Sequence, residues 1–209
     1  MEEFEKRIVE LTTAMWKTAG SRFLAASRLS QREKLSTLSI ASLSVVATMV
    51  GLLDAHAGNA AQRIGLSVAV LSALMSLLVL VISLVAGFSQ DAVQSHKLHE
   101  SAMHISEVRR RLVDLLARCK SEKQVHWGQY DTLRSSYDTY LRECPFNHET
   151  IDFRRFEAQH RLCPEFCSGG KPGISWLESG RVRAAYFLSS AWLSIVACVT
   201  VASLALLTF

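Results

Sequence analysis

Three stretches of the chain carry no charged side chain, and they dominate its hydrophobic pattern. They run from Leu35 to Leu53, from Ile64 to Phe88 and from Ala184 to Phe209. About 20 apolar residues are enough for a helix to cross a bilayer, and in lipid a helix satisfies its own backbone hydrogen bonds. We therefore predict three transmembrane helices, the first two forming a hairpin. The first stretch is rich in Ser and Thr, which leaves open a buried or interfacial helix.

Between and before these stretches, apolar residues recur at the 3–4 spacing of amphipathic helices. Such helices are expected over residues 3–34, continuing into the membrane, and over 91–123, running on without a break from the second membrane helix. Further helices are expected over 125–143, stopped by Pro145, and over 147–162, with Asn147 as the N-cap. Residues 163–173 form a linker, and no strand is predicted. The core positions of the two middle helices are Ile105, Val108, Leu112, Leu115 and Leu116, and Trp127, Tyr130, Leu133, Tyr137 and Leu141.

This pattern predicts an all-α membrane protein with four parts. These are an amphipathic N-terminal helix over 1–34, a transmembrane hairpin over 35–88, a cytosolic helical region over 89–183 and a third transmembrane helix over 184–209. Lys and Arg gather before the first span and before the third, whereas the loop 54–63 has one basic residue. By the positive-inside rule, the N-terminus and the long middle region are cytoplasmic and the C-terminus lies outside. The first 34 residues do not resemble a secretory signal.

The net charge of +4 changes this picture little. It suits the anionic inner leaflet of a membrane, and it is too small to indicate binding to nucleic acid. We find no Gly-rich phosphate loop and no hydrolase or metalloprotease motif. We therefore expect no enzymatic activity, no catalytic residue and no cofactor.

Metal binding and pH sensing are the site chemistries that remain. Zinc-binding side chain types gather in one segment, at Cys144, His160, Cys163 and Cys167. Their spacing lacks the CxxC pair typical of zinc sites, and a cytosolic location keeps thiols reduced. His96, His99 and His104 share one helix, where a solvated surface is favoured over a pH sensor. We expect no metal site.

Small residues follow one face of the second uncharged stretch: Gly65, Ala69, Ser72, Ser76, Ser83 and Gly87. Small residues allow membrane helices to approach closely, and Ser can form hydrogen bonds across the interface. The contact lies either within the hairpin or between chains. The three stretches contain no Asp, Glu, Lys, Arg or His. This absence argues against a coupled transporter or a charge-lined channel and is compatible with a hydrophobic gate.

The segment YDTYLRECPFNHETIDFRRF, from Tyr137 to Phe156, resembles the SLATT family of two-transmembrane effectors. A Tyr-rich helix end precedes Asn147 and His148, and Ile151, Asp152 and an aromatic residue follow. The segment RFLAASRLSQREKLSTLS, from Arg22 to Ser39, is also similar to the family. The resemblance covers about residues 5–165. The third span is expected beyond that core, as in longer branches of the family such as the one found beside reverse transcriptases.

The resemblance implies an oligomeric inner-membrane effector of a bacterial anti-phage or conflict system. A nucleotide-messenger synthase or a reverse-transcriptase sensor would trigger it, and it would then permeabilise the membrane and cause growth arrest or cell death. Asn147, His148 and Asp152 would be structural motif positions. The alternative is a membrane-anchored signalling or scaffold protein whose helices recruit a cytosolic partner.

Overall fold

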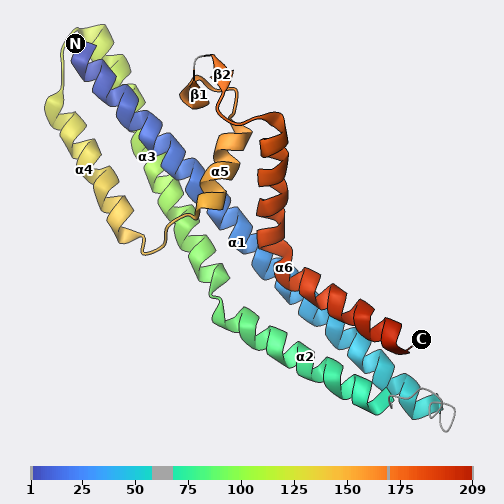
Figure 1. The fold of residues 1–209 in the computed structure, drawn as a ribbon. Coiled ribbons are helices and arrows are strands. Elements are labelled where there is room, and N and C mark those ends of the chain that lie inside the picture. The colour runs from blue at the N-terminus through green and yellow to red at the C-terminus, as the bar shows by residue number, and fades with distance from the viewer. Residues whose placement is uncertain (1, 58–67, 169, 209) are drawn as a thin grey trace. The chain divides into compact units, whose positions relative to one another are not determined.

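The computed structural model of the chain describes residues 2–57, 68–168 and 170–208. The helices are α1 (Glu2–Ala57), α2 (Val68–Phe88), α3 (Asp91–Glu122), α4 (Trp127–Glu143), α5 (Thr150–Gln159) and α6 (Trp176–Thr208), with a short 3-10 helix, η2 (Pro164–Phe166). The predicted all-α fold class is confirmed (Figure 1). The chain forms two compact units: unit 1 holds residues 1–29 and 93–187, and unit 2 holds residues 30–92 and 188–209.

The long N-terminal helix was predicted correctly. α1 continues from its polar beginning into the first uncharged stretch without interruption. Its first turn carries Glu2, Glu3 and Glu5, which favour the positive end of the helix dipole. The segment from Leu35 to Leu53 is therefore helical, and its role as a membrane span stays a prediction.

The predicted continuous rod from the second uncharged stretch into the next helix is wrong. α2 ends at Phe88 and α3 begins at Asp91. The backbone N–H of Ser89 donates to the carbonyl of Ala86 at 3.3 Å, and its hydroxyl donates to the same oxygen at 2.8 Å. Gln90 has a φ of 51°, in the left-handed region, so the chain cannot continue as one helix there.

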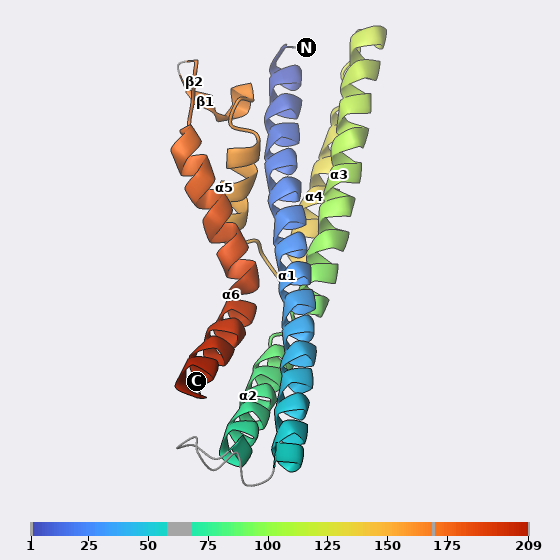
Figure 2. The same cartoon turned by 90° about the vertical axis from the view of Figure 1, so that its right-hand side faces the viewer.

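The core of unit 1 lies where α1, α3 and α4 meet. α3 contributes Ile105, Val108, Leu112 and Leu115 to it, as the spacing predicted, and Tyr130 and Tyr137 come from α4. Phe4, Ile8 and Met15 of α1 fill the same cluster. Figures 1 and 2 show the unit 1 part of α1 between α3 and α4 on one side and α5 on the other.

Aromatic rings hold α5 against α1 within unit 1. Phe156 packs edge-on against Trp16, with ring centroids 4.9 Å apart. Its ring also lies against Gly20, where an added Cβ would come within 2.0 Å of a ring carbon. Because only a hydrogen fits there, Gly20 sets how closely the two helices approach.

The predicted linker over 163–173 contains more structure than expected. It includes η2 and the strands β1 (Cys167–Ser168) and β2 (Lys171–Pro172), which form a small antiparallel pair. No strand was predicted in this segment, because a two-residue strand is too short to show an alternating pattern. The backbone N–H of Gly173 donates to the carbonyl of Phe166 at 2.9 Å and closes this turn.

Unit 2 is built from the uncharged parts of α1, α2 and α6. Its buried cluster consists of Leu43, Met75, Ile82 and Ala197. Large apolar side chains elsewhere on these helices are exposed, among them Leu38, Met49, Leu77, Leu80, Phe88 and Val199. Two described segments are long and apolar enough to cross a membrane: one begins at Ser72 within α2, and the other is the Trp176–Thr200 part of α6.

Candidate functional site

An ion pair buried in unit 1 joins α1 to α5. The Arg28 Nε donates to Asp152 Oδ1 at 2.8 Å, and Nη2 donates to Oδ2 at 3.1 Å. The two side chains are 3% and 0% exposed. The Arg28 Nη2 also lies 2.8 Å from Glu149 Oε1, whose side chain is 64% exposed. Two parallel hydrogen bonds of this kind fix both distance and orientation.

Both oxygens of the Asp152 carboxylate accept hydrogen bonds. Asp152 Oδ2 also accepts a hydrogen bond from the backbone N–H of Glu149 at 2.9 Å, and the Glu149 side chain accepts one from the backbone of Asp152 in return. This reciprocal capping box begins α5. Burial lowers the pKa of Arg28, but the hydrogen bonds to Asp152 and Glu149 outweigh burial and raise the pKa above its ordinary value.

A second polar group adjoins this pair. Arg22 is buried and its Nη1 donates to the Ser101 hydroxyl, which links α1 to α3. His148 is half-buried, and its Nδ1 has no hydrogen-bond partner. Burial and the charge of Arg22 lower the pKa of His148, against a smaller opposite effect of Asp152. Burial and the buried Arg22 guanidinium therefore favour the neutral form of the imidazole.

The helix that follows the motif is capped differently from the prediction. Glu149, not Asn147, is the N-cap of α5, and the helix ends at Gln159 rather than about Leu162. The Asn147 side chain instead accepts a hydrogen bond from the backbone N–H of His148 at 2.9 Å. Glu149 takes the cap position because Asp152, three residues later, completes the box with it. Asp152 forms the ion pair, and His148 lies beside it.

The last part of α6 in unit 1 is tied to α1 as well. The Tyr186 hydroxyl donates to the backbone carbonyl of Leu24 at 2.7 Å. Within unit 2, the Ser194 hydroxyl donates to the carbonyl of Leu35 at 3.2 Å and accepts a hydrogen bond from the Ser39 hydroxyl at 2.8 Å. Such Ser contacts between helices are typical of membrane bundles.

The small-residue face of α2 divides between two environments. Ser72 and Ser83 are half-buried, and Ser72 lies 4.0 Å from where a side chain on Gly51 of α1 would begin. Ser76 and Gly87 are exposed. The face therefore lies at the edge of the packing between α1 and α2. Ala69 lies in α2, but its side chain is outside the description, and Gly65 falls outside the described residues altogether.

The zinc-binding side chain types make local contacts. The His160 ring bonds to the carbonyl of Phe156 at 2.9 Å, Cys167 lies 3.6 Å from the carbonyl of Arg161, and Cys144 lies 3.3 Å from that of Phe146. Within residues 2–57, 68–168 and 170–208, no three His, Cys, Asp or Glu side chains are arranged to hold a metal ion. On α3, His99 packs against Phe23 and His104 stacks on Tyr140, and His96 is exposed.

The sequence identified one residue of the buried ion pair as a motif position but did not predict the pair or its capping box. Asp152 carried a motif signal, but Arg28 was read only as one of several basic residues before a span. Because 124 positions separate the two, no local pattern connects them. Arg22 and Arg28 are buried within unit 1, and Arg32 lies 3.1 Å from Asp91 within unit 2. Among the described residues, the exposed basic residues that directly precede the first and third uncharged stretches are therefore Lys34, Arg181 and Arg183.

The fold and composition define an all-α membrane protein, and the comparison with protein families is specific. Residues 4–207 match the SMODS and SLOG-associating 2TM effector domain family 5. The chain belongs to this family, and the predicted SLATT resemblance is confirmed. The match includes nearly all of α6, so the expected limit of the resemblance near residue 165 was too short. No curated protein and no solved structure matches the chain.

Proposed function

We propose that the chain is an oligomeric effector of a bacterial anti-phage or conflict system that permeabilises the inner membrane when triggered. Membership of a family of 2TM effector domains supports the effector role. Two apolar helices with largely exposed side chains support action within a bilayer. The outcome of permeabilisation is growth arrest or death of the infected cell.

The observation that carries the proposal is a line of hydroxyl groups on the uncharged part of α1. Thr37, Ser44 and Thr48 lie on one face of the helix, and two of the three are exposed. Each hydroxyl donates to the carbonyl four residues earlier, at 2.8–3.0 Å. This bond lets a hydroxyl face lipid at little cost, and the same oxygen still accepts a hydrogen bond from water. These hydroxyl groups are therefore compatible with lipid contact in a closed state and with water contact in an open state.

The same property extends to α2. Ser76 is exposed, and its hydroxyl donates to the Ser72 carbonyl at 3.0 Å. Ser72 itself lies close to Gly51 of α1, on the same face as the hydroxyl line. Because the uncharged stretches contain no Asp, Glu, Lys, Arg or His, a path along these hydroxyls would be polar but uncharged. Such a path closes by dewetting rather than by a charged gate.

One chain is too small to enclose such a path alone. The helices of unit 2 pack around Leu43, Met75 and Ile82, so the interior of a single chain is filled by side chains. A pore therefore requires several copies arranged around a common axis. The exposed small positions Ser76 and Gly87 suit close contact between copies.

Unit 1 would receive the signal. α1 and α6 each contribute residues to both units, so a rearrangement around Arg28 and Asp152 would act on helices that continue into the uncharged stretches. A partner sensor, such as a nucleotide-messenger synthase or a reverse transcriptase, would supply the trigger. The exposed Lys34, Arg181 and Arg183 favour a cytoplasmic unit 1 and an outside C-terminus.

Substitution of a single hydroxyl tests this function. We expect Ser76→Leu, in cells that carry the chain with its flanking genes, to abolish phage-triggered growth arrest at unchanged protein abundance. Ser203→Leu is the matched control, because Ser203 is also exposed and also donates to a carbonyl four residues earlier, in α6. Growth arrest that survives Ser76→Leu and Thr48→Leu, with assembly intact, would favour the alternative of a membrane-anchored scaffold.

A further inference from the structure

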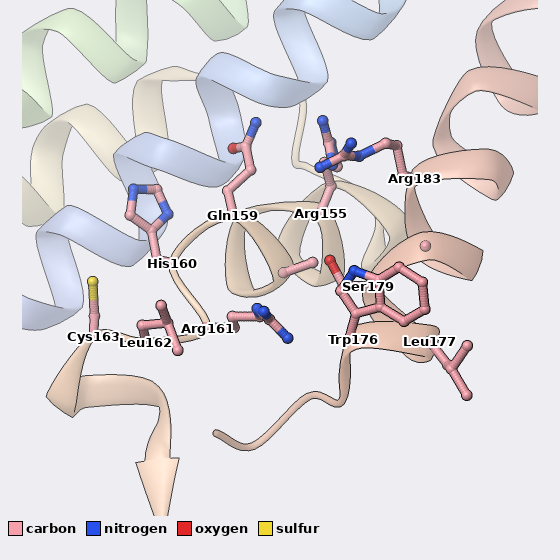
Figure 3. A pocket seen from close by; sticks show the side chains of 12 residues that line it. Arg155, Gln159, His160, Arg161, Leu162, Cys163, Trp176, Leu177, Ser179 and Arg183 are labelled. Carbon is pink, nitrogen blue, oxygen red and sulfur yellow. The ribbon is translucent and has the colours of Figure 1, made fainter. Parts of the chain in front are cut away.

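A cleft in unit 1 lies where the end of α5, the turn after it and the first turns of α6 meet (Figure 3). Its volume is about 690 Å³, which is within the range of small-molecule sites. The side chains that give it its character are Arg155, Gln159, Arg161, Trp176, Ser179 and Arg183. Arg155 lies in the segment Tyr137–Phe156 that carries the family resemblance. None of the six is one of the motif positions Asn147, His148 and Asp152, and none belongs to the hydroxyl line.

The cleft is positively charged and its charges are uncompensated. Arg155, Arg161 and Arg183 line it, and none of its lining residues is an Asp or a Glu. Within the described parts of the chain, the ion pairs of the neighbouring helices involve Arg28 and Arg154 instead. Figure 3 shows the Arg155 and Arg183 side chains close together above the ring of Trp176. Three guanidinium groups without a carboxylate attract an anion.

Arg155 gives a second, independent indication. Its Nη1 atom is buried and has no hydrogen-bond partner, although its guanidinium lies 5.8 Å from the ring of Tyr186. A buried donor without an acceptor costs free energy that a bound acceptor would recover. Burial and the nearby charge of Arg183 also lower the pKa of Arg155. An anion placed between the two arginines would remove this repulsion.

The other lining groups indicate what kind of anion fits. Gln159 and Ser179 supply neutral hydrogen-bond donors beside the guanidinium groups. The Trp176 side chain is 73% exposed and Leu177 is 67% exposed at the rim, so an apolar or aromatic part of a ligand has a surface to cover. Planar guanidinium groups form paired hydrogen bonds with phosphate oxygens.

We propose that this cleft binds a phosphate-bearing anion, with Arg155 and Arg183 as its principal ligands and Arg161 at its edge. The phosphate comes either from an anionic lipid headgroup or from a soluble phosphorylated molecule. Both sources share the recognition chemistry. Because Arg155 belongs to α5 and Arg183 to α6, the bound anion joins the two helices at a point where no ion pair joins them among the described residues. This site goes beyond the proposed permeabilisation and does not depend on it.

Calorimetric titration of the full chain tests the proposal without any measurement of flux. One arm titrates pyrophosphate into protein held in a zwitterionic detergent. The other arm compares nanodiscs of phosphatidylcholine with nanodiscs that contain phosphatidylglycerol, and measures the anionic lipid that remains bound after transfer to detergent. We expect Arg155→Gln and Arg183→Gln each to weaken binding at least about tenfold, since each removes a charged hydrogen-bond donor pair.

Neighbouring arginines outside the cleft provide matched controls. Arg154→Gln on α5 and Arg181→Gln on α6 make the same change in charge at positions that do not line the cleft. We expect them to weaken binding less than about twofold, because a charge that does not touch the anion acts on it only through solvent and is screened by salt. Arg183→Lys, which keeps the charge, should bind more tightly than Arg183→Gln. Pyrophosphate binding assigns the site to a soluble ligand, and retention of phosphatidylglycerol alone assigns it to lipid. Binding of neither, or equal losses in the control variants, would overturn the proposal.

Discussion

The substitution Asp152→Asn removes the charge that faces the buried Arg28 guanidinium while leaving the size of the side chain nearly unchanged. Asp152 accepts two hydrogen bonds from Arg28 and one from the backbone N–H of Glu149. An Asn side chain has one oxygen and one NH₂ group, so at least one of these donors would face another donor. The buried Arg28 would keep only Glu149 as a charged partner.

The size of the effect follows from burial. Removing one partner of a buried ion pair costs about 3–5 kcal/mol, because the other charge is left uncompensated. Glu149 stays 2.8 Å from Arg28 but is 64% exposed, and an exposed pair contributes up to about 1 kcal/mol. We therefore expect Asp152→Asn to lower the free energy of unfolding by about 2–4 kcal/mol. This is a large share of the roughly 5–15 kcal/mol typical of a folded protein.

Denaturant unfolding of the full chain in a mild detergent, followed by circular dichroism, measures this loss. Glu107→Gln is the control, because Glu107 pairs with Arg111 on the exposed surface of α3, and we expect it to change stability by less than about 1 kcal/mol. The double variant Arg28→Met with Asp152→Leu should lose less than the sum of its single variants, since an apolar pair can replace a buried ion pair. Additive losses, or Asp152→Asn as mild as the control, would refute the reasoning.

Three further predictions concern neighbouring features. Gly20→Ala should lower the free energy of unfolding by about 1–3 kcal/mol through overpacking, because its Cβ would lie 2.0 Å from the Phe156 ring. Adding Phe156→Leu should restore part of the lost stability, measured by thermal unfolding. Because its pKa is lowered in the folded state, His148 resists protonation, so stability should be full above about pH 6.5 and fall as the pH drops below it. His148→Gln should flatten that pH profile in denaturant titrations. Gln90→Gly should raise the melting temperature, since Gln90 has a φ of 51° and glycine adopts this conformation without strain; an unchanged or lower value would contradict this.

Much of the helical architecture could be predicted because it depends on local spacing. Ile105, Val108, Leu112 and Leu115 recur at 3–4 residue intervals, and all of them are buried in the core of unit 1. The length and composition of the uncharged stretches likewise predict helices. The polar beginning of α1, before the first uncharged stretch, contains no Pro. Its one glycine, Gly20, is tolerated within the helix.

The features that were missed depend on contacts or on backbone geometry without a sequence signal. Ser89 and Gln90 are not strong helix breakers, and the break arises because Gln90 adopts a left-handed conformation. Arg28 and Asp152 meet only in the folded chain, because the two residues lie on different helices. The cap of α5 was assigned to Asn147 by residue preference, whereas the reciprocal bonds between Glu149 and Asp152 decide it. At these positions, contacts formed in the folded chain decide the structure, and the local preference of each residue type does not.

Membrane potential during phage challenge tests the central claim most directly. Single cells that carry the chain with its flanking genes would be followed with a potential-sensitive dye, beside cells that carry the Ser76→Leu variant at equal abundance. The proposed function predicts depolarisation before lysis with the natural chain and a retained potential with the variant. Growth arrest of cells whose membrane potential stays intact throughout infection would contradict permeabilisation.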